Sequence, residues 1–136
     1  MSTTETETIV TGVDFVSVPT RDLERAVAFY GDTLGLRRTT YRPERNFAEF
    51  DTRTVTLGVV DPERMGIGSF ERNANHVALQ VDDVAAARAT LEGRGVEFMG
   101  DILDTGVCHM AFFADPDGNA LMLHSRYAPV TPTAPS

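Results

Sequence analysis

Hydrophobic and polar positions follow the same pattern twice along the chain. Residues 13–18 alternate as in a strand with one packed face, and apolar residues at three- and four-residue spacing follow them. The same order of patterns returns at 74–79, where His76 takes the place of Phe15, 61 positions earlier (76 − 15 = 61). The repeat predicts a fold made of two copies of one strand and helix unit.

The first copy predicts a βαβββ unit. Thr20 or Asp22 is suited to cap a helix that carries apolar residues from Leu23 to Leu34, and Gly35 offers a left-handed stop. Three short strands are predicted to follow at 36–41, 47–51 and 54–60.

The second copy predicts the same unit. A strand at 75–81 leads to Asp82 or Asp83, either of which is suited to cap a helix that ends near Gly93. Further strands are predicted at 96–99, 107–113 and 120–124. The turn at 115–119, Asp-Pro-Asp-Gly-Asn, is expected to have a structural role between the last two strands.

The predicted fold class is α+β, with two tandem βαβββ modules that form a curved half-barrel around a shared cavity. The modules span about 11–60 and 74–126 within a single domain at 10–127. The ends, 1–9 and 128–136, are small, polar or proline-rich, and are predicted to be disordered tails.

Composition and charge exclude several classes of partner. Twenty acidic residues against twelve basic ones give a net charge of −8, which repels phosphate backbones and excludes a nucleic-acid partner. No apolar run approaches the roughly 20 residues that span a bilayer, so no membrane partner is predicted. Cys108 is the one cysteine and no apolar signal segment opens the chain, which favours a cytoplasmic location.

Several motifs resemble the vicinal oxygen chelate superfamily, which includes glyoxalase I, extradiol dioxygenases, fosfomycin-modifying enzymes and bleomycin-binding resistance proteins. They are Asp22-Leu23-Glu24-Arg25-Ala26, Phe29-Tyr30, Leu34-Gly35-Leu36 and the phrase from Phe112 to Asn119. The resemblance extends over roughly 11–126 and implies the two-module fold and a homodimer. It does not select an activity, because function belongs to the site and not to the scaffold.

In the metal-using members of that superfamily, four strand positions facing the cavity supply histidine, glutamate or glutamine ligands to a divalent ion. The resemblance places them at Phe15, Thr56, His76 and Met122. A phenyl ring does not coordinate and a thioether is a weak donor for such ions, so only His76 remains a competent ligand. One imidazole binds a divalent ion weakly, and we therefore predict neither a metal nor another cofactor.

Two alternative roles for histidine stay open. His124 lies two residues after Met122 and shares its face, and His109 lies on the neighbouring predicted strand, so His76, His124 and His109 form a rearranged metal-site alternative. His76 is also the candidate catalytic acid or base, since imidazole titrates near neutrality. The simpler interpretation is a histidine hydrogen-bonded to Gln80 or Ser17. Cys108 is expected to be a packed, inert thiol.

The alternation of side chains along the predicted strands, with a period of two residues, predicts a cavity face to which both copies contribute. Its predicted ligand-binding residues are Phe15, Ser17, Thr56, His76, Gln80, Met122 and His124. This mixture suits a flat or partly apolar organic molecule, although the same side chains are also able to fill the cavity themselves. The leading hypothesis is a metal-free small-molecule-binding homodimer of the glyoxalase/bleomycin resistance type. The alternative is a lyase, isomerase or dioxygenase that uses the rearranged metal site or His76 as a metal-free acid or base.

Overall fold

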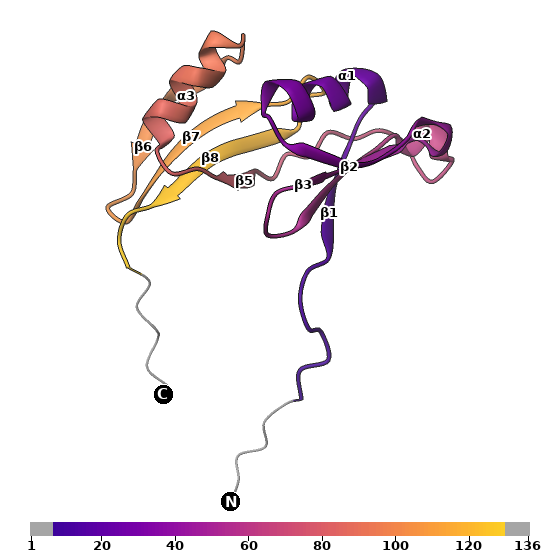
Figure 1. The fold of residues 1–136 in the computed structure, drawn as a ribbon, viewed down its shortest axis with the longest axis horizontal. Helices are drawn as coiled ribbons and strands as arrows, with labels where there is room; N and C mark the ends of the chain where they lie inside the picture. The colour runs from indigo at the N-terminus through magenta and orange to yellow at the C-terminus, as the bar shows by residue number, and fades with distance from the viewer. Residues whose placement is uncertain (1–6, 130–136) are drawn as a thin grey trace, which may run out of the picture.

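The computed structural model describes residues 7–129 and shows two βαβββ modules joined by a linker (Figure 1). The first contains β1 (Phe15–Pro19), α1 (Leu23–Ala28), η1 (Phe29–Thr33), β2 (Arg37–Arg42), η2 (Pro43–Arg45), β3 (Phe47–Asp51) and β4 (Thr56–Val60). The second contains β5 (Val77–Gln80), α3 (Val84–Gly93), β6 (Phe98–Asp104), β7 (Cys108–Ala114) and β8 (Ala120–Arg126). The α+β fold and its two tandem units, predicted from the repeat, are confirmed.

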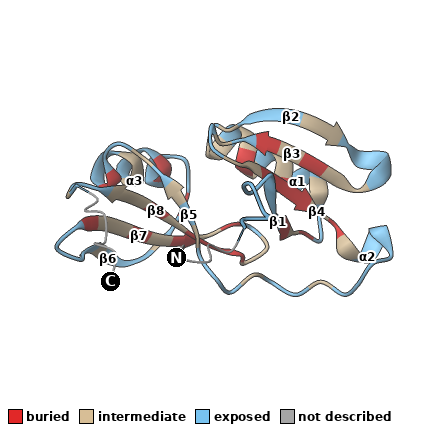
Figure 2. Ribbon diagram, turned by 90° about the horizontal axis from the view of Figure 1, so that it is seen from below, coloured by how far each residue is buried: buried red, intermediate tan, exposed pale blue. Residues whose placement is uncertain are grey.

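Each module forms its own four-stranded mixed sheet. The strand orders are β1-β4-β3-β2 and β5-β8-β7-β6, and only the pairs β1·β4 and β5·β8 are parallel. The two sheets lie side by side and do not close into a barrel (Figure 2). Helices α1 and α3 each cover one face of their own sheet, and both lie on the same side of the molecule in Figure 1.

The core lies between each helix and its sheet. Along β3 the buried Ala48 and Phe50 alternate with more accessible neighbours, as a strand with one packed face requires. Tyr30 and Phe113 are also fully buried. Burying one large apolar side chain contributes roughly 1.5–3 kcal/mol, so this packing fixes which sheet face turns away from the helices.

Two aspartates begin the helices. The side chain of Asp22 accepts a hydrogen bond from the backbone N–H of Arg25 at 3.0 Å, and Asp83 does the same for Ala86 at 3.0 Å. These contacts select Asp22 and Asp83 from the predicted pairs of capping residues. The first helix then widens into the π-helical turn η1, and Gly35 follows it at φ +78°, the left-handed conformation that glycine adopts without strain.

Besides the helical turns η1 and η2, two elements differ from the prediction. The linker contains a short helix, α2 (Pro62–Met65), which Asp61 caps by accepting from the Arg64 N–H at 3.1 Å. Strand β6 continues to Asp104, well beyond the predicted 96–99, because the pairing with β7 shifts between Met99 and Leu103. Such a bulge lets a strand continue after a local irregularity.

The turn after β7 joins the second module to the first. The carboxylate of Asp117 accepts hydrogen bonds from Thr20 Oγ1 at 2.6 Å, the Arg21 N–H at 3.0 Å and Arg25 Nη2 at 3.0 Å. The Asn119 side-chain amide donates to the Pro19 carbonyl at 2.7 Å. The turn therefore has the structural role expected of it, and it fixes the start of α1 against the second sheet.

The predicted tails lie largely outside the described residues, since 1–6 and 130–136 are not described. No helix within 7–129 has both the length and the apolar character needed to cross a membrane.

Candidate functional site

Three of the predicted ligand-binding residues share one face of the first sheet. On β1, Val18 is buried against the helix layer, whereas Phe15 points the other way and is 59% exposed. Ser17 has the same parity as Phe15, and Thr56 pairs directly with Phe15 across β1 and β4. These side chains therefore lie on the face that no helix covers, as the two-residue alternation of side chains along a strand predicts.

The other four share the corresponding face of the second sheet. His124 pairs with Gln80, and Met122 pairs with Ala78, so all of them have the parity opposite to the buried Leu121 and Leu123. His76 immediately precedes β5 with this same parity. We call the helix-free sides of the two sheets the open face, defined by Phe15, Ser17, Thr56, His76, Ala78, Gln80, Met122 and His124.

The neighbour of His76 is an aromatic ring, neither Gln80 nor Ser17. Its imidazole lies 5.0 Å from the ring centroid of Phe112, at an interplanar angle of 72°. This edge-to-face arrangement is a favoured geometry for two rings. His76 is exposed, so its imidazole is accessible on the open face.

The sequence-based prediction did not include several apolar residues on the open face. Phe112 pairs with Met122, and Met110 pairs with His124, so β7 contributes an aromatic ring and a thioether to the same surface. Met99 pairs with Phe112 and is 55% exposed. The period-two parity of 107–113 was a sufficient signal for Met110 and Phe112, since Phe113 and Ala111 alternate with them.

His109 does not join the other two histidines. It pairs with Ser125 and has the parity of the buried Ala111, which places it on the opposite face of the sheet. Its Nε2 lies 3.4 Å from Asp104 Oδ2, and its ring packs on Tyr127 with centroids 5.0 Å apart. The rearranged three-histidine site is therefore not assembled, and no cluster of three metal-ligating His, Cys, Asp or Glu side chains is present within 7–129.

The four inherited metal positions do not fit a divalent ion. Phe15 and Thr56 are direct partners in the first sheet, but Met122 pairs with Ala78, two residues beyond His76. In this register the position equivalent to Thr56 is Ala120, whose methyl side chain cannot coordinate a metal ion. The offset therefore adds no ligand. A phenyl ring, a hydroxyl and a thioether beside one imidazole do not form a tetrahedral or octahedral donor set.

Cys108 is 5% exposed, and its Sγ lies 3.0 Å from Thr105 Oγ1. The thiol is thus packed and hydrogen-bonded, as expected from the sequence. It pairs with Arg126 across β7 and β8.

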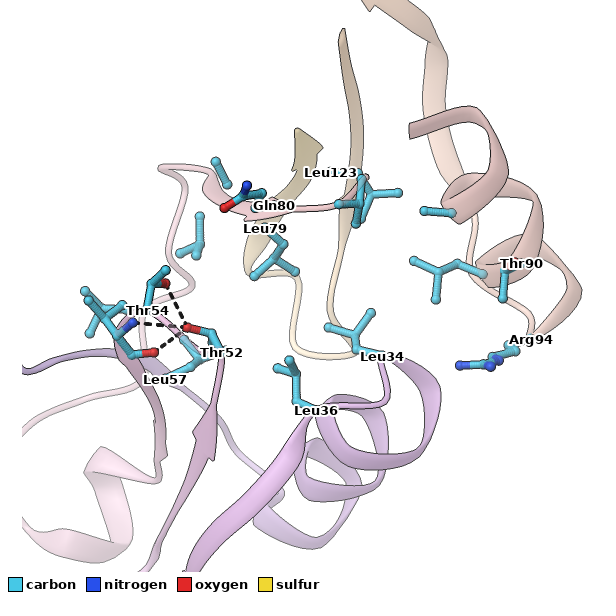
Figure 3. A pocket seen from close by; sticks show the side chains of 17 residues that line it. Leu34, Leu36, Thr52, Thr54, Leu57, Leu79, Gln80, Thr90, Arg94 and Leu123 are labelled. Atoms are coloured by element: carbon cyan, nitrogen blue, oxygen red, sulfur yellow. Dashed lines mark hydrogen bonds between the residues drawn. The ribbon is translucent and has the colours of Figure 1, made fainter. Parts of the chain in front are cut away.

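Two hollows flank the strands of the second sheet. One, of about 520 Å³, is bordered by Gln80, Asp82, His124 and Arg126, and so includes two predicted ligand-binding residues. The other, of about 420 Å³, is the inter-module pocket shown in Figure 3. Its lining comes mostly from side chains of the helix-bearing faces, and among the seven predicted ligand-binding residues it includes only Gln80. The expected cavity between the modules therefore lies largely on the other side of the sheets.

Comparison with known proteins identifies the family. The model of the Glyoxalase/Bleomycin resistance protein/Dioxygenase superfamily matches residues 12–123. The chain belongs to this superfamily. The resemblance inferred from the motifs is thereby confirmed over almost the whole described region.

Relatives within the superfamily have different names. A lactoylglutathione lyase from Haemophilus influenzae is 30% identical and covers 71% of this chain and 79% of its own length. A probable lactoylglutathione lyase from Vibrio cholerae is 27% identical, with coverage of 75% and 81%. The crystal structure of TnmS3, an antibiotic binding protein from Streptomyces sp. CB03234, superposes with a TM-score of 0.73 at 28% identity, covering 88% of this chain and 99% of that one.

Proposed function

We propose that this superfamily member binds an organic small molecule on its open face without a resident metal ion. The observation that carries the proposal is the set of side chains at the inherited metal positions. Phe15, Thr56 and Met122 are unsuited to a divalent ion, and the one retained imidazole, His76, packs against Phe112. At these positions the chain therefore carries side chains suited to contacts with an organic molecule instead of metal ligands.

The remaining chemistry of the open face supports the same function. Phe15 in the first sheet and Met99 in the second are each more than half exposed, and Phe112, Met110 and Met122 share the face of the second sheet with Met99. Exposed rings and thioethers adapt to flat apolar ligands, and an exposed apolar surface of this kind marks a binding site. TnmS3, which is named as an antibiotic binding protein, supports a natural-product ligand.

The proposal includes a homodimer. A small-molecule site normally buries 70–90% or more of its ligand, and a face open along one side does not do so. A second copy placed over the open face would supply the missing wall through a self-complementary contact. Light scattering on the purified protein should then give about twice the chain mass of 14.8 kDa.

A titration with flat aromatic antibiotics tests the binding function. The chain has no tryptophan, so changes in ligand fluorescence can be followed without that background. We expect saturable binding that EDTA leaves unchanged, and a loss of about tenfold or more in affinity for Phe112→Ala. Phe70→Ala, in the linker, is the matched control and should bind as the wild type does. Binding that requires added metal, or that Phe112→Ala leaves intact, would contradict the proposal.

The names of two relatives and the retained His76 favour a second candidate, a lyase. Its test is turnover of lactoylglutathione by the protein with and without added Zn²⁺ or Ni²⁺. If turnover occurs and both His76→Ala and His124→Ala abolish it in a folded protein, the binding-only function fails. Metal dependence of the rate then separates a metal enzyme from one that uses His76 as acid or base.

A further inference from the structure

The inter-module pocket is lined mostly by the helix-bearing faces of the sheets and shares only Ala78 and Gln80 with the open face. Leu34 and Leu36 at the end of η1 form one wall, and Leu79 and Leu123 of the second sheet form the wall facing them (Figure 3). Its volume of about 420 Å³ lies within the range of small-molecule sites. Because both modules contribute, the pocket exists only where they meet.

The middle of this pocket is apolar. Leu57 and Leu123 are almost fully buried, and Val16, Leu34, Leu36 and Leu79 also line the space. A cavity lined in this way favours hydrocarbon or aromatic groups, because it offers few hydrogen-bond partners and removes apolar surface from water.

Polar groups lie at the two ends. Arg94 lies at one end, and the turn with Thr52 and Thr54 lies at the other (Figure 3). The Thr52 hydroxyl is occupied within that turn, where it accepts from the Val55 N–H at 3.2 Å and contacts the Thr54 hydroxyl. The pocket thus presents one cation at the edge of an apolar interior.

Arg94 is positioned but has no carboxylate partner. It follows α3, and its Nη1 donates to the carbonyl of Thr33 at 2.8 Å, which fixes the guanidinium across the module boundary. None of the ion pairs found within 7–129 includes Arg94, although the chain carries an excess of eight negative charges. A guanidinium has five N–H donors, so most remain available for an anion, and a carboxylate matches their geometry.

We infer that the inter-module pocket binds an amphipathic organic carboxylate, with its apolar body between the leucines and its carboxylate at Arg94. This ligand is distinct from the one proposed for the open face. Since it contacts both modules, its binding stabilises their arrangement against unfolding.

Decanoate is a suitable probe, measured by isothermal titration calorimetry beside decanol and decyltrimethylammonium. We expect decanoate to bind most tightly and the cation most weakly. Arg94→Gln should weaken decanoate about tenfold and leave decanol nearly unchanged, because only the charged contact is lost. Arg94→Lys should retain part of the affinity, and Arg45→Gln, on an exposed turn, is the matched control. Equal binding of all three probes, or no effect of Arg94→Gln, would overturn the inference.

A second pair of variants tests the location. Ala87 lines the pocket on α3, whereas Ala89 on the same helix is exposed and does not line it. Ala87→Leu should reduce decanoate affinity about tenfold by filling the space, and Ala89→Leu should not change it.

Methyl NMR of the wild type gives an answer that does not depend on whether a variant folds. Decanoate should shift the methyl signals of Leu34, Leu36 and Leu79 and leave those of Met110 and Met122 on the open face in place. Shifts confined to the methionines would refute the pocket and would leave the function proposed for the open face standing. Failure of the antibiotic titration would not affect this result.

Discussion

The hydroxyl of Tyr30 donates a hydrogen bond to Asp115 Oδ2 at 2.6 Å, and both residues are buried. The bond joins the helix of the first module to the turn of the second. Burial, followed by the negative charge of Asp115, raises the pKa of Tyr30 well above its ordinary value. Tyr30 therefore remains protonated and keeps its role as donor.

Tyr30→Phe should lower the free energy of unfolding by about 1.5–3 kcal/mol, since it removes a buried hydrogen bond to a charged group. Urea denaturation measures the change. Tyr127→Phe removes a similar bond, from the Tyr127 hydroxyl to Asp104 at 2.8 Å, but on the exposed surface. This matched control should lose much less stability, and an equal loss in both variants would argue against a special role for the buried pair.

The free energy of unfolding should fall at alkaline pH. The folded-state pKa of Tyr30 is raised, so its contribution is fully present below the unfolded value of about 10 and declines as the pH rises above it. In an absorbance titration, we expect Tyr30 to ionise only as the chain unfolds. Tyr30→Phe should remove that component of the titration. Ionisation of Tyr30 in a chain whose circular dichroism is still native would be incompatible with its burial.

Asp117→Ala should destabilise the protein by about 2–4 kcal/mol. Its side chain is 1% exposed and accepts from Thr20, Arg21 and Arg25, so its removal breaks three hydrogen bonds and leaves the buried Thr20 hydroxyl without this partner. Asp101→Ala, on the exposed surface of β6, is the control and should stay within about 0.5 kcal/mol of the wild type. Thermal or urea unfolding distinguishes the two.

Metal affinity should appear when the missing donors are restored. The triple variant Phe15→His, Thr56→Glu, Met122→Glu places one imidazole and two carboxylates at the other three inherited positions, and together with His76 they form a donor set that suits Zn²⁺ or Ni²⁺. We expect it to retain metal after dialysis, by elemental analysis, whereas the wild type does not. Adding His76→Ala to the triple variant should remove most of the retained metal. Stoichiometric metal in the wild type would refute a metal-free site.

The periodicity of the sequence was sufficient to predict which residues lie on each face of the sheets. The alternation around Phe15 and around Met122 placed each on its correct side, because burial of one strand face fixes the other. It did not reveal η1, since one turn of π-helix hardly alters the spacing of apolar residues. The same alternation along 107–113 also indicates that Phe112 lies on the open face, although Phe112 was not among the predicted ligand-binding residues.

The alternation of side chains along the strands was not sufficient to predict where the inter-module pocket lies. How the modules sit depends on contacts such as Thr20 with Asp117, which are 97 residues apart in the chain. Local pattern carries no information on a pairing of this kind. His109 is a different case, because it was grouped with His76 and His124 by the proximity of the predicted strands, whereas the alternation along its own strand places it on the other face.

The linkage through Asp117 makes each of the duplicated halves complete a hydrogen-bonded site of the other. The acceptor belongs to one half and all three of its side-chain or backbone donors belong to the other, so a separated half leaves a carboxylate or its donors without partners. We therefore expect two fragments made by a cut within the linker to associate with each other, and Asp117→Ala to weaken that association.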